Sequence, residues 1–118
     1  MDKMIDRLDR LYPQLKRCWK RCHFCGKPTE HIHHIKGRSN LLLRYDLKNL
    51  IPLCANCHHL IHLNHLELMI PPARWLYLEQ MSNIQLQDWL LSHNQTREEF
   101  FKTKETEIKE FINGKHHI

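Results

Sequence analysis

The sequence predicts an α+β fold, in which a small metal-stabilised core of two strands and a helix is flanked by an N-terminal helix and C-terminal helices. Two observations lead to this prediction. Apolar residues recur at helical spacing near both ends of the chain. Between them stand two Cys-x-x-Cys pairs, Cys22/Cys25 and Cys54/Cys57, separated by residues 26–53. This gap is too long for a minimal zinc ribbon and leaves room for an inserted hairpin.

The pattern divides the chain into an N-terminal helix within residues 1–17, a core over 18–66 and a helical extension over 67–118. We expect the first helix over about residues 2–11. Pro13 should bend or end it, because proline lacks the N–H that the helix ladder needs.

In the core, strands are expected over residues 30–35 and 50–53, and a helix over about 55–66. The loop 36–40 connects the first strand to a stretch that is irregular or shortly helical. The extension carries apolar residues at helical spacing, and its last helix should begin with a capping box at Thr96-Arg97-Glu98-Glu99. This extension shows no recognisable chemistry, so packing and contact with a protein partner both remain open for it.

The formal charge of +5 is unevenly distributed along the 118 residues. Residues 1–48 hold twelve Lys and Arg against five Asp and Glu, whereas residues 49–118 hold six against eight. A basic half that carries a metal site suits a polyanion such as nucleic acid, although a solvated surface explains the same charge. The basic run around Trp19 has two readings as well: a phosphate contact, or a helix face with Trp19 in the core.

The sequence contains no long apolar run and no secretory signal, so we expect no membrane association and a cytoplasmic location. The four paired cysteines, Cys22, Cys25, Cys54 and Cys57, supply soft ligands for one tetrahedral structural Zn²⁺. Disulfides in a secreted protein are the alternative, but two equal spacings and an odd Cys18 favour the metal.

Histidines indicate a second metal site. His58 and His62 are at positions i and i+4 of the expected helix, so both rings could reach one ion. The pair His33-His34 could supply a third ligand, and a histidine that does not bind the metal could act as general base. His33 and His34 would point to opposite faces of a regular strand, which makes His31 a rival for either role.

The order His33-His34, Asn49, His58, His62, together with the flanking cysteine pairs, resembles the HNH endonuclease family, whose fold is a ββα-metal core. The resemblance covers about residues 18–66. It implies that His33, His58 and His62 hold a catalytic divalent ion (Mg²⁺, Mn²⁺, Ni²⁺ or Zn²⁺), that His34 is the general base that activates water, and that Asn49 ties the loop and orients this base. A looser similarity, to NinG-type phage recombination nucleases, involves residues 34–49.

The resemblance implies a metal-dependent enzyme of phage or bacterial origin that hydrolyses phosphodiester bonds in DNA within the bacterial cytoplasm. Candidate phosphate contacts are Lys36, Arg38 and Arg44, each of which could also be a solvated loop charge. RNA is an open alternative substrate, since the motif does not choose the sugar. The alternative function is a non-catalytic zinc module that binds nucleic acid. A phage or bacterial protein could be a partner of the C-terminal helices.

Overall fold

The computed structural model describes residues 2–61 and 69–114 of the chain. Its elements follow in the order α1 (Lys3–Asp9), α2 (Tyr12–Cys18), β1 (His31–His34), α3 (Leu41–Arg44), the 3₁₀ helix η1 (Leu47–Asn49), β2 (Leu50–Leu53), α4 (Ala55–Leu60), α5 (Pro72–Ser82), α6 (Leu86–Ser92) and α7 (Arg97–Ile112). Helices therefore surround a two-stranded sheet, which confirms the predicted α+β class.

The N-terminal segment forms two helices instead of the single helix expected over residues 2–11. Asp2 caps α1 by accepting hydrogen bonds from the N–H groups of Met4 and Ile5, and α1 ends at Asp9. Pro13 does not end a helix but is the second residue of α2. A first-turn N–H has no partner inside a helix, so proline costs nothing at this position.

The two strands pair in an antiparallel hairpin, with His33 opposite Ile51 and His34 opposite Leu50. β2 is buried along its whole length, whereas β1 is exposed or half-buried. Among the described residues β1 pairs only with β2, so its other edge is open. This open edge borders the cavity described below.

The larger hydrophobic cluster joins all three segments that the sequence suggests. Its buried members come from the N-terminal helices, the centre and the C-terminal helices: Leu8, Leu11, Leu15, Leu42, Tyr45, Leu50, Leu86, Phe100, Phe101 and Ile108. A smaller cluster forms around three of the paired cysteines together with Ile51, Leu53, Ile61 and Ile70. The segment boundaries at residues 17/18 and 66/67 stay predictions, but the apolar packing runs across both.

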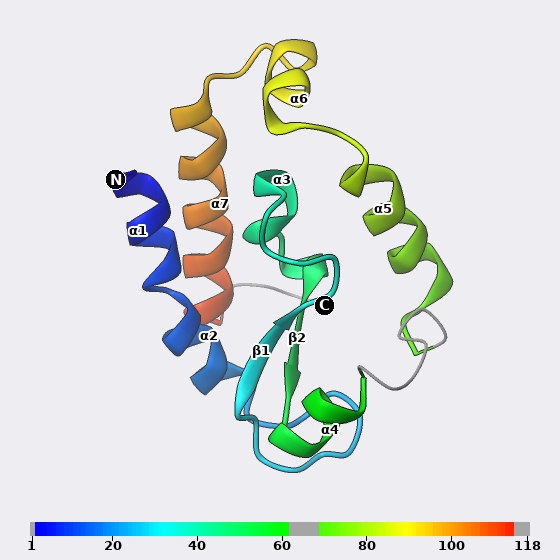
Figure 1. Ribbon diagram of the computed structural model, residues 1–118. Helices are drawn as coiled ribbons and strands as arrows, with labels where there is room; N and C mark the ends of the chain where they lie inside the picture. Colours follow the sequence, from blue (N-terminus) through cyan, green and yellow to red (C-terminus); the bar gives the residue numbers. More distant parts are fainter. Residues whose placement is uncertain (1, 62–68, 115–118) are drawn as a thin grey trace.

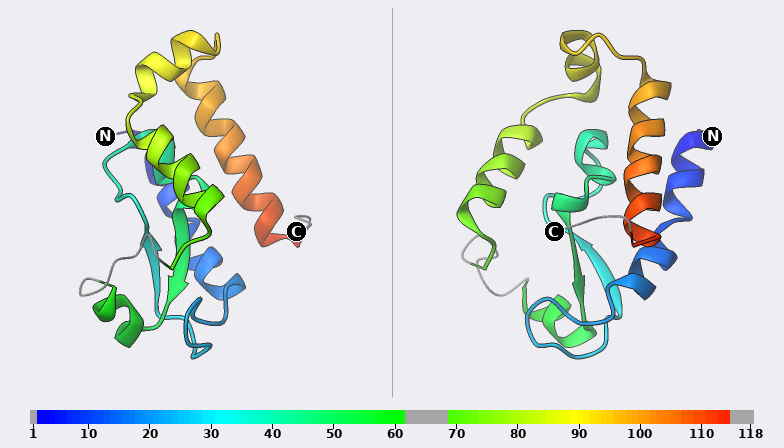
Figure 2. Two further views of the ribbon diagram at one scale, coloured as in Figure 1. Left: turned by 90° about the vertical axis from the view of Figure 1, so that its right-hand side faces the viewer. Right: turned by 180° about the vertical axis from the view of Figure 1, so that it is seen from behind.

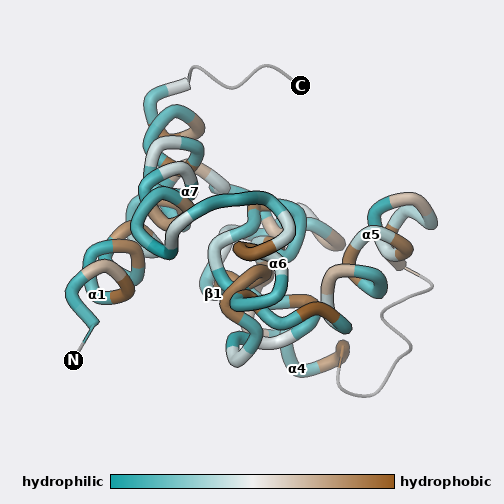
Figure 3. Tube along the Cα trace, turned by 90° about the horizontal axis from the view of Figure 1, so that it is seen from above, coloured by the Kyte–Doolittle hydropathy of each residue, from teal (hydrophilic) through white to brown (hydrophobic). Residues whose placement is uncertain are grey.

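Helices lie on both sides of the hairpin. α7 runs beside α1 and α2 on one side, while α5 lies on the other side and α4 follows the end of β2 (Figures 1 and 2). Hydrophobic and hydrophilic positions alternate along α1 and α7 when the molecule is seen from above (Figure 3). The expected capping box opens α7, with Thr96 and Glu99 bonded to each other's backbone N–H. Asn113 follows the helix, and Gly114 then has a φ of +73°.

Polar contacts fasten α5 to the loops of the core. Arg74 donates hydrogen bonds to the carbonyl oxygens of Lys48 and Leu50 at 2.7 and 2.9 Å. The amide of Asn40 donates to carbonyl oxygens at the C-terminal end of α5 and just beyond it. The C-terminal extension therefore holds the segment between the two strands in place.

None of the helices in the described part of the chain combines the length and the apolar character that crossing a membrane requires. Of the helix expected over 55–66, the structure describes α4, which ends at Leu60 with Ile61 as its C-cap residue. Residues 62–66 of that expectation lie outside the described residues.

Candidate metal centre and adjoining cavity

The four paired cysteines converge at the base of the hairpin. The sulfur atoms of Cys22, Cys25, Cys54 and Cys57 all lie within 4.8 Å of one another, and Sγ of Cys25 is 3.5 Å from Sγ of Cys54. Sulfurs bound tetrahedrally to one Zn²⁺ would be about 3.8 Å apart, given a Zn–S bond of about 2.3 Å. The donor set therefore fits a zinc ion.

Local backbone geometry explains this convergence. The first pair sits on a tight turn, in which the N–H of Gly26 donates to the carbonyl of Cys22 and Gly26 adopts a φ of +75°. The turn is attached to β2, because the N–H of His23 donates to the carbonyl of Pro52 at 2.9 Å. In the second pair, Cys54 is the N-cap of α4, and its sulfur accepts from the N–H of Cys57 at 3.4 Å.

The electrostatics of the four thiols favour a bound cation. Burial raises the pKa of the Cys57 thiol to about 12, and the neighbouring thiols add to this effect. Burial also acts to raise the pKa of Cys22, but hydrogen bonds from backbone N–H groups outweigh it and lower this pKa to about 6. Without a cation Cys22 therefore ionises readily and Cys57 resists ionisation, whereas a bound metal ion would stabilise the thiolate form of its ligands.

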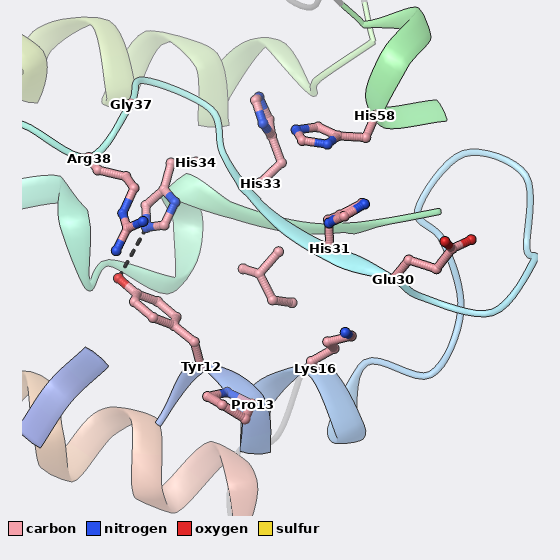
Figure 4. A pocket seen from close by; sticks show the side chains of 11 residues that line it. Tyr12, Pro13, Lys16, Glu30, His31, His33, His34, Gly37, Arg38 and His58 are labelled. Atoms are coloured by element: carbon pink, nitrogen blue, oxygen red, sulfur yellow. Dashed lines mark hydrogen bonds between the residues drawn. The ribbon is translucent and has the colours of Figure 1, made fainter. Parts of the chain in front are cut away.

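Beside this centre, a cavity of about 580 Å³ runs between α2, β1 and α4. Imidazoles, cations and one carboxylate line it, and the lining residues are Tyr12, Pro13, Lys16, Glu30, His31, Ile32, His33, His34, Gly37, Arg38 and His58 (Figure 4). Every residue of β1 contributes, which places the cavity along the open edge of this strand. Side chains from both faces of the strand can therefore reach one space.

His31 and His33 share a face of β1 and both meet α4. The ring centroid of His58 lies 4.9 Å from that of His31 and 5.2 Å from that of His33. Within residues 2–61 and 69–114, the four cysteines alone bring three or more metal-binding atoms within 4.8 Å of one another. His62, the remaining predicted ligand, lies outside the described residues, so the set His33, His58 and His62 stays a prediction, with His31 still a rival.

His34 points to the opposite face of β1, toward α2. Its Nε2 lies 3.0 Å from the hydroxyl of Tyr12 and 3.2 Å from the carbonyl oxygen of Arg44. Burial, followed by the nearby charge of Arg38, lowers the pKa of His34 to about 4. The ring is therefore neutral at physiological pH and has a lone pair that can accept a proton.

Asn49 ties the segment after β1 to the start of β2. It is fully buried; its Oδ1 accepts from the N–H of Lys36 at 2.8 Å, and its Nδ2 donates to the carbonyl oxygens of Leu43 and Gly37 at 3.1 and 3.4 Å. The N–H of Ile35 donates to its backbone carbonyl. Asn49 thus fixes the backbone that leaves His34, while orientation of the ring itself by Asn49 stays a prediction.

The three predicted phosphate contacts have different surroundings. Lys36 forms an ion pair with Glu79, and its ammonium lies 4.1 Å from the ring centroid of Trp75. Arg44 pairs with Asp9 at 2.9 Å. Arg38 is exposed and lines the cavity, so it is the member of this set that faces the imidazoles.

Tyr12 and Glu30 are lining residues with polar groups that the sequence-based site did not include. Tyr12 was expected only as one of the apolar positions of the N-terminal helix, and Glu30 only as the start of the first strand. No local signal marks either, because both reach the cavity through the packing of α2 against β1. Lys16 belongs to the basic run, and its position on the cavity agrees with the phosphate-contact reading. Trp19 packs against the larger core cluster, which agrees with the other reading.

Comparison with known proteins places the cysteine cluster and most of the cavity lining, all but Tyr12 and Pro13, in one family segment. Residues 16–63 match the model of the HNH endonuclease family. A similar sequence is the mitochondrial DNA mismatch repair protein mutS homolog of Sarcophyton glaucum, 36% identical over 53 residues, which are 41% of this chain and 5% of that protein. No solved structure gives a significant match. The match supports a nuclease-type function, and residues 16–63 of this chain carry a domain of the HNH endonuclease family.

Proposed function

We propose that this protein is a metal-dependent endonuclease that hydrolyses phosphodiester bonds in DNA. The observation that carries the proposal is one cavity lined by His33, His34 and His58, within a segment that matches the HNH endonuclease family. In this proposal His33, His58 and His62 hold a divalent ion, Mg²⁺, Mn²⁺, Ni²⁺ or Zn²⁺. When bound, such an ion would polarise the scissile phosphate and offset charge on the leaving oxygen.

The chain's own residues supply the remaining steps. His34, neutral and partly buried, takes a proton from water. The water oxygen then forms a bond to phosphorus, and the bond between phosphorus and the leaving sugar oxygen breaks. Asn49 fixes the backbone on which the base is carried. Arg38 and Lys16, both exposed on the cavity, are placed to contact the phosphates next to the scissile one.

DNA is the preferred substrate because the similar protein from Sarcophyton glaucum is named as a DNA mismatch repair protein. The shared stretch is a small part of that protein, so its other properties do not extend to this chain. The excess of basic residues in the first half of the chain suits the backbone of either nucleic acid. Parallel assays on DNA and RNA of the same sequence separate the two substrates.

Cleavage of supercoiled plasmid with added Mg²⁺, Mn²⁺, Ni²⁺ or Zn²⁺ tests the proposal. We expect the wild-type protein to nick or cut and His34→Ala to lose at least about 100-fold in rate, the scale of general base catalysis. His59→Ala is the matched control, because His59 lies exposed on α4 beside His58 and does not line the cavity. No cleavage with any metal, or equal rates for wild type and His34→Ala, contradicts the proposal.

The cysteine cluster also fits a second function, a non-catalytic zinc module that binds nucleic acid. Counting metal ions distinguishes it from the nuclease. One tightly held zinc per chain is expected of the module, whereas the nuclease should bind a second, exchangeable ion that His58→Ala removes while the zinc remains.

A further inference from the structure

Three polar atoms meet beneath β1 and restrict where the proton of His34 can be. The hydroxyl oxygen of Tyr12 lies 2.7 Å from the carbonyl oxygen of Arg44 and 3.0 Å from Nε2 of His34. The same Nε2 lies 3.2 Å from the carbonyl oxygen of Arg44. Each pair is within hydrogen-bonding distance, but at most two hydrogens, one on the hydroxyl of Tyr12 and one on Nε2, are available for the three contacts.

The donor and acceptor roles follow from the chemistry of the groups. A carbonyl oxygen can only accept, and a tyrosine hydroxyl has one hydrogen to donate. The hydroxyl of Tyr12 donates it to the carbonyl of Arg44. Its oxygen can then only accept from Nε2 of His34, so both neighbours of Nε2 are acceptors. Nε2 must therefore carry the hydrogen, and in the neutral ring Nδ1 carries the lone pair.

The opposite tautomer leaves two repulsive contacts. If the hydroxyl of Tyr12 donated to a bare Nε2, the carbonyl of Arg44 would lie 2.7 Å from the hydroxyl oxygen with no hydrogen between them. The lone pair of Nε2 would also face that carbonyl at 3.2 Å. A buried carbonyl that loses its donor costs about 1–3 kcal/mol. The arrangement with hydrogen on Nε2 satisfies all three groups.

Aromatic packing holds Tyr12 in this position. Its ring meets the ring of His34 edge-on, with centroids 5.3 Å apart, and stacks on the ring of Tyr45 at 5.9 Å. Burial, followed by the charge of Asp9, raises the pKa of Tyr12 above its usual range, so the hydroxyl keeps its hydrogen. Figure 4 shows one nitrogen of His34 directed at this hydroxyl and the other turned away from it.

We propose that Tyr12 is a positioning residue, which holds the ring of His34 through the hydrogen on Nε2 and so leaves Nδ1 free to take the proton from water. This inference rests on the proposed nuclease function and deepens it. Tyr12 lies ahead of the segment 16–63 that matches the family, so the N-terminal helices contribute to the site from outside the matched domain.

The proton balance is complete. As the water oxygen bonds to phosphorus, its proton moves to Nδ1, and the bond to the leaving sugar oxygen breaks. His34 then carries hydrogen on both nitrogens. The hydrogen on Nε2 still faces the hydroxyl oxygen of Tyr12 and the carbonyl of Arg44, whose partial negative charges stabilise the cation. The leaving oxygen takes a proton from solvent, and Nδ1 returns its proton to solvent.

Nitrogen NMR of the zinc-loaded full chain, labelled with ¹⁵N in its histidine rings, tests the tautomer without any reaction. We expect His34 at neutral pH to show a protonated Nε2 and an unprotonated Nδ1. Assignment comes from the signals that vanish in His34→Gln. A protonated Nδ1 with a bare Nε2 would overturn the inference.

Kinetics test the role of Tyr12. We expect Tyr12→Phe to lower kcat about tenfold with little change in KM, because the phenyl ring fills the same space but no longer holds Nε2. Tyr45→Phe is the matched control: it removes a buried hydroxyl that bonds to Asp9 at 2.7 Å and does not touch His34. It should lower stability and keep kcat.

The two failures can be told apart. A wild-type protein that cuts, while Tyr12→Phe keeps its kcat or Tyr45→Phe loses as much, overturns the positioning role and leaves the nuclease function standing. A wild-type protein that cuts no nucleic acid with any metal overturns the nuclease function and the proton transfer together, whatever tautomer the NMR spectrum shows.

Discussion

The buried side chain of Asn49 accepts a hydrogen bond from the backbone N–H of Lys36 at 2.8 Å. This bond connects the residue before β2 to the backbone just after β1, thirteen positions earlier in the sequence. The same amide donates to the carbonyl of Leu43 at 3.1 Å. The side chain of Asn49 therefore bonds the backbone of the segment between β1 and β2 at two points, beyond the last paired residues of the strands. The position of His34 depends on this backbone.

Replacing Asn49 by alanine should destabilise the fold. The N–H of Lys36 and the carbonyl of Leu43 would lose their partner in a buried place, which costs about 3 kcal/mol. Urea unfolding measures the difference. Asn83→Ala is the control: Asn83 is exposed at the end of α5, and we expect its replacement to cost about 0.5 kcal/mol. Equal costs would show that Asn49 is not the tie inferred here.

Loss of one zinc ligand should unfold the base of the hairpin. Structural zinc contributes about 10–16 kcal/mol to the folding of small zinc domains, so Cys54→Ser should lose the metal together with part of its helical signal. Cys18→Ser serves as the control, since Cys18 is an exposed thiol outside the cluster. Metal analysis and circular dichroism before and after a chelator give the readout. A Cys54→Ser protein that keeps both its zinc and its helical signal would contradict the structural role.

The sequence alone predicted those features that depend on residues close together in the chain. The cysteine pairs, the strands of the hairpin and the capping box at Thr96 each involve residues a few positions apart, and local chemistry decides them. The boundary between α1 and α2 was missed because proline is compatible with both the end and the start of a helix. Which of these applies depends on how Leu11 and Leu15 pack in the core.

The surroundings of the predicted site residues could not be read from the sequence, because they depend on contacts between distant segments. Lys36 is 43 positions from Glu79, and Tyr12 is 22 positions from His34. Only the packing of α5 and α2 around the hairpin brings these partners together. The opposite orientations of His33 and His34 were foreseen from strand geometry, but the open edge of β1, which lets both line one cavity, was not.

Acid should destabilise the protein in part through His34. Burial lowers the pKa of His34 to about 4, below the usual histidine value of about 6.5. Between these two pH values His34 is protonated in the unfolded chain and neutral in the folded chain. Stability from this group is therefore complete above about pH 6.5 and falls as the pH drops through 4. Partial exposure of the ring reduces the loss between pH 7 and pH 5 to about 1 kcal/mol.

The comparison of wild type with His34→Gln isolates this contribution, because both proteins share the other histidines and the zinc centre. The free energy of unfolding, measured in urea at pH 7 and pH 5, should fall by about 1 kcal/mol more in the wild type. Equal losses in the two proteins would mean that His34 titrates alike in the folded and unfolded states.

The salt dependence of nucleic-acid binding should separate the cations that contact phosphate from those that stabilise the fold. Arg38 and Lys16 are exposed on the cavity, whereas Lys36 is held by Glu79 and lies against Trp75. Each phosphate contact adds about one to the slope of log affinity against log salt concentration.

Arg38→Gln and Lys16→Gln should each reduce this slope by about one, measured by fluorescence anisotropy with labelled duplex DNA and no added Mg²⁺. Lys36→Gln should leave the slope unchanged and lower stability instead, and a slope that falls equally in all three variants would show that Lys36 leaves Glu79 to contact DNA.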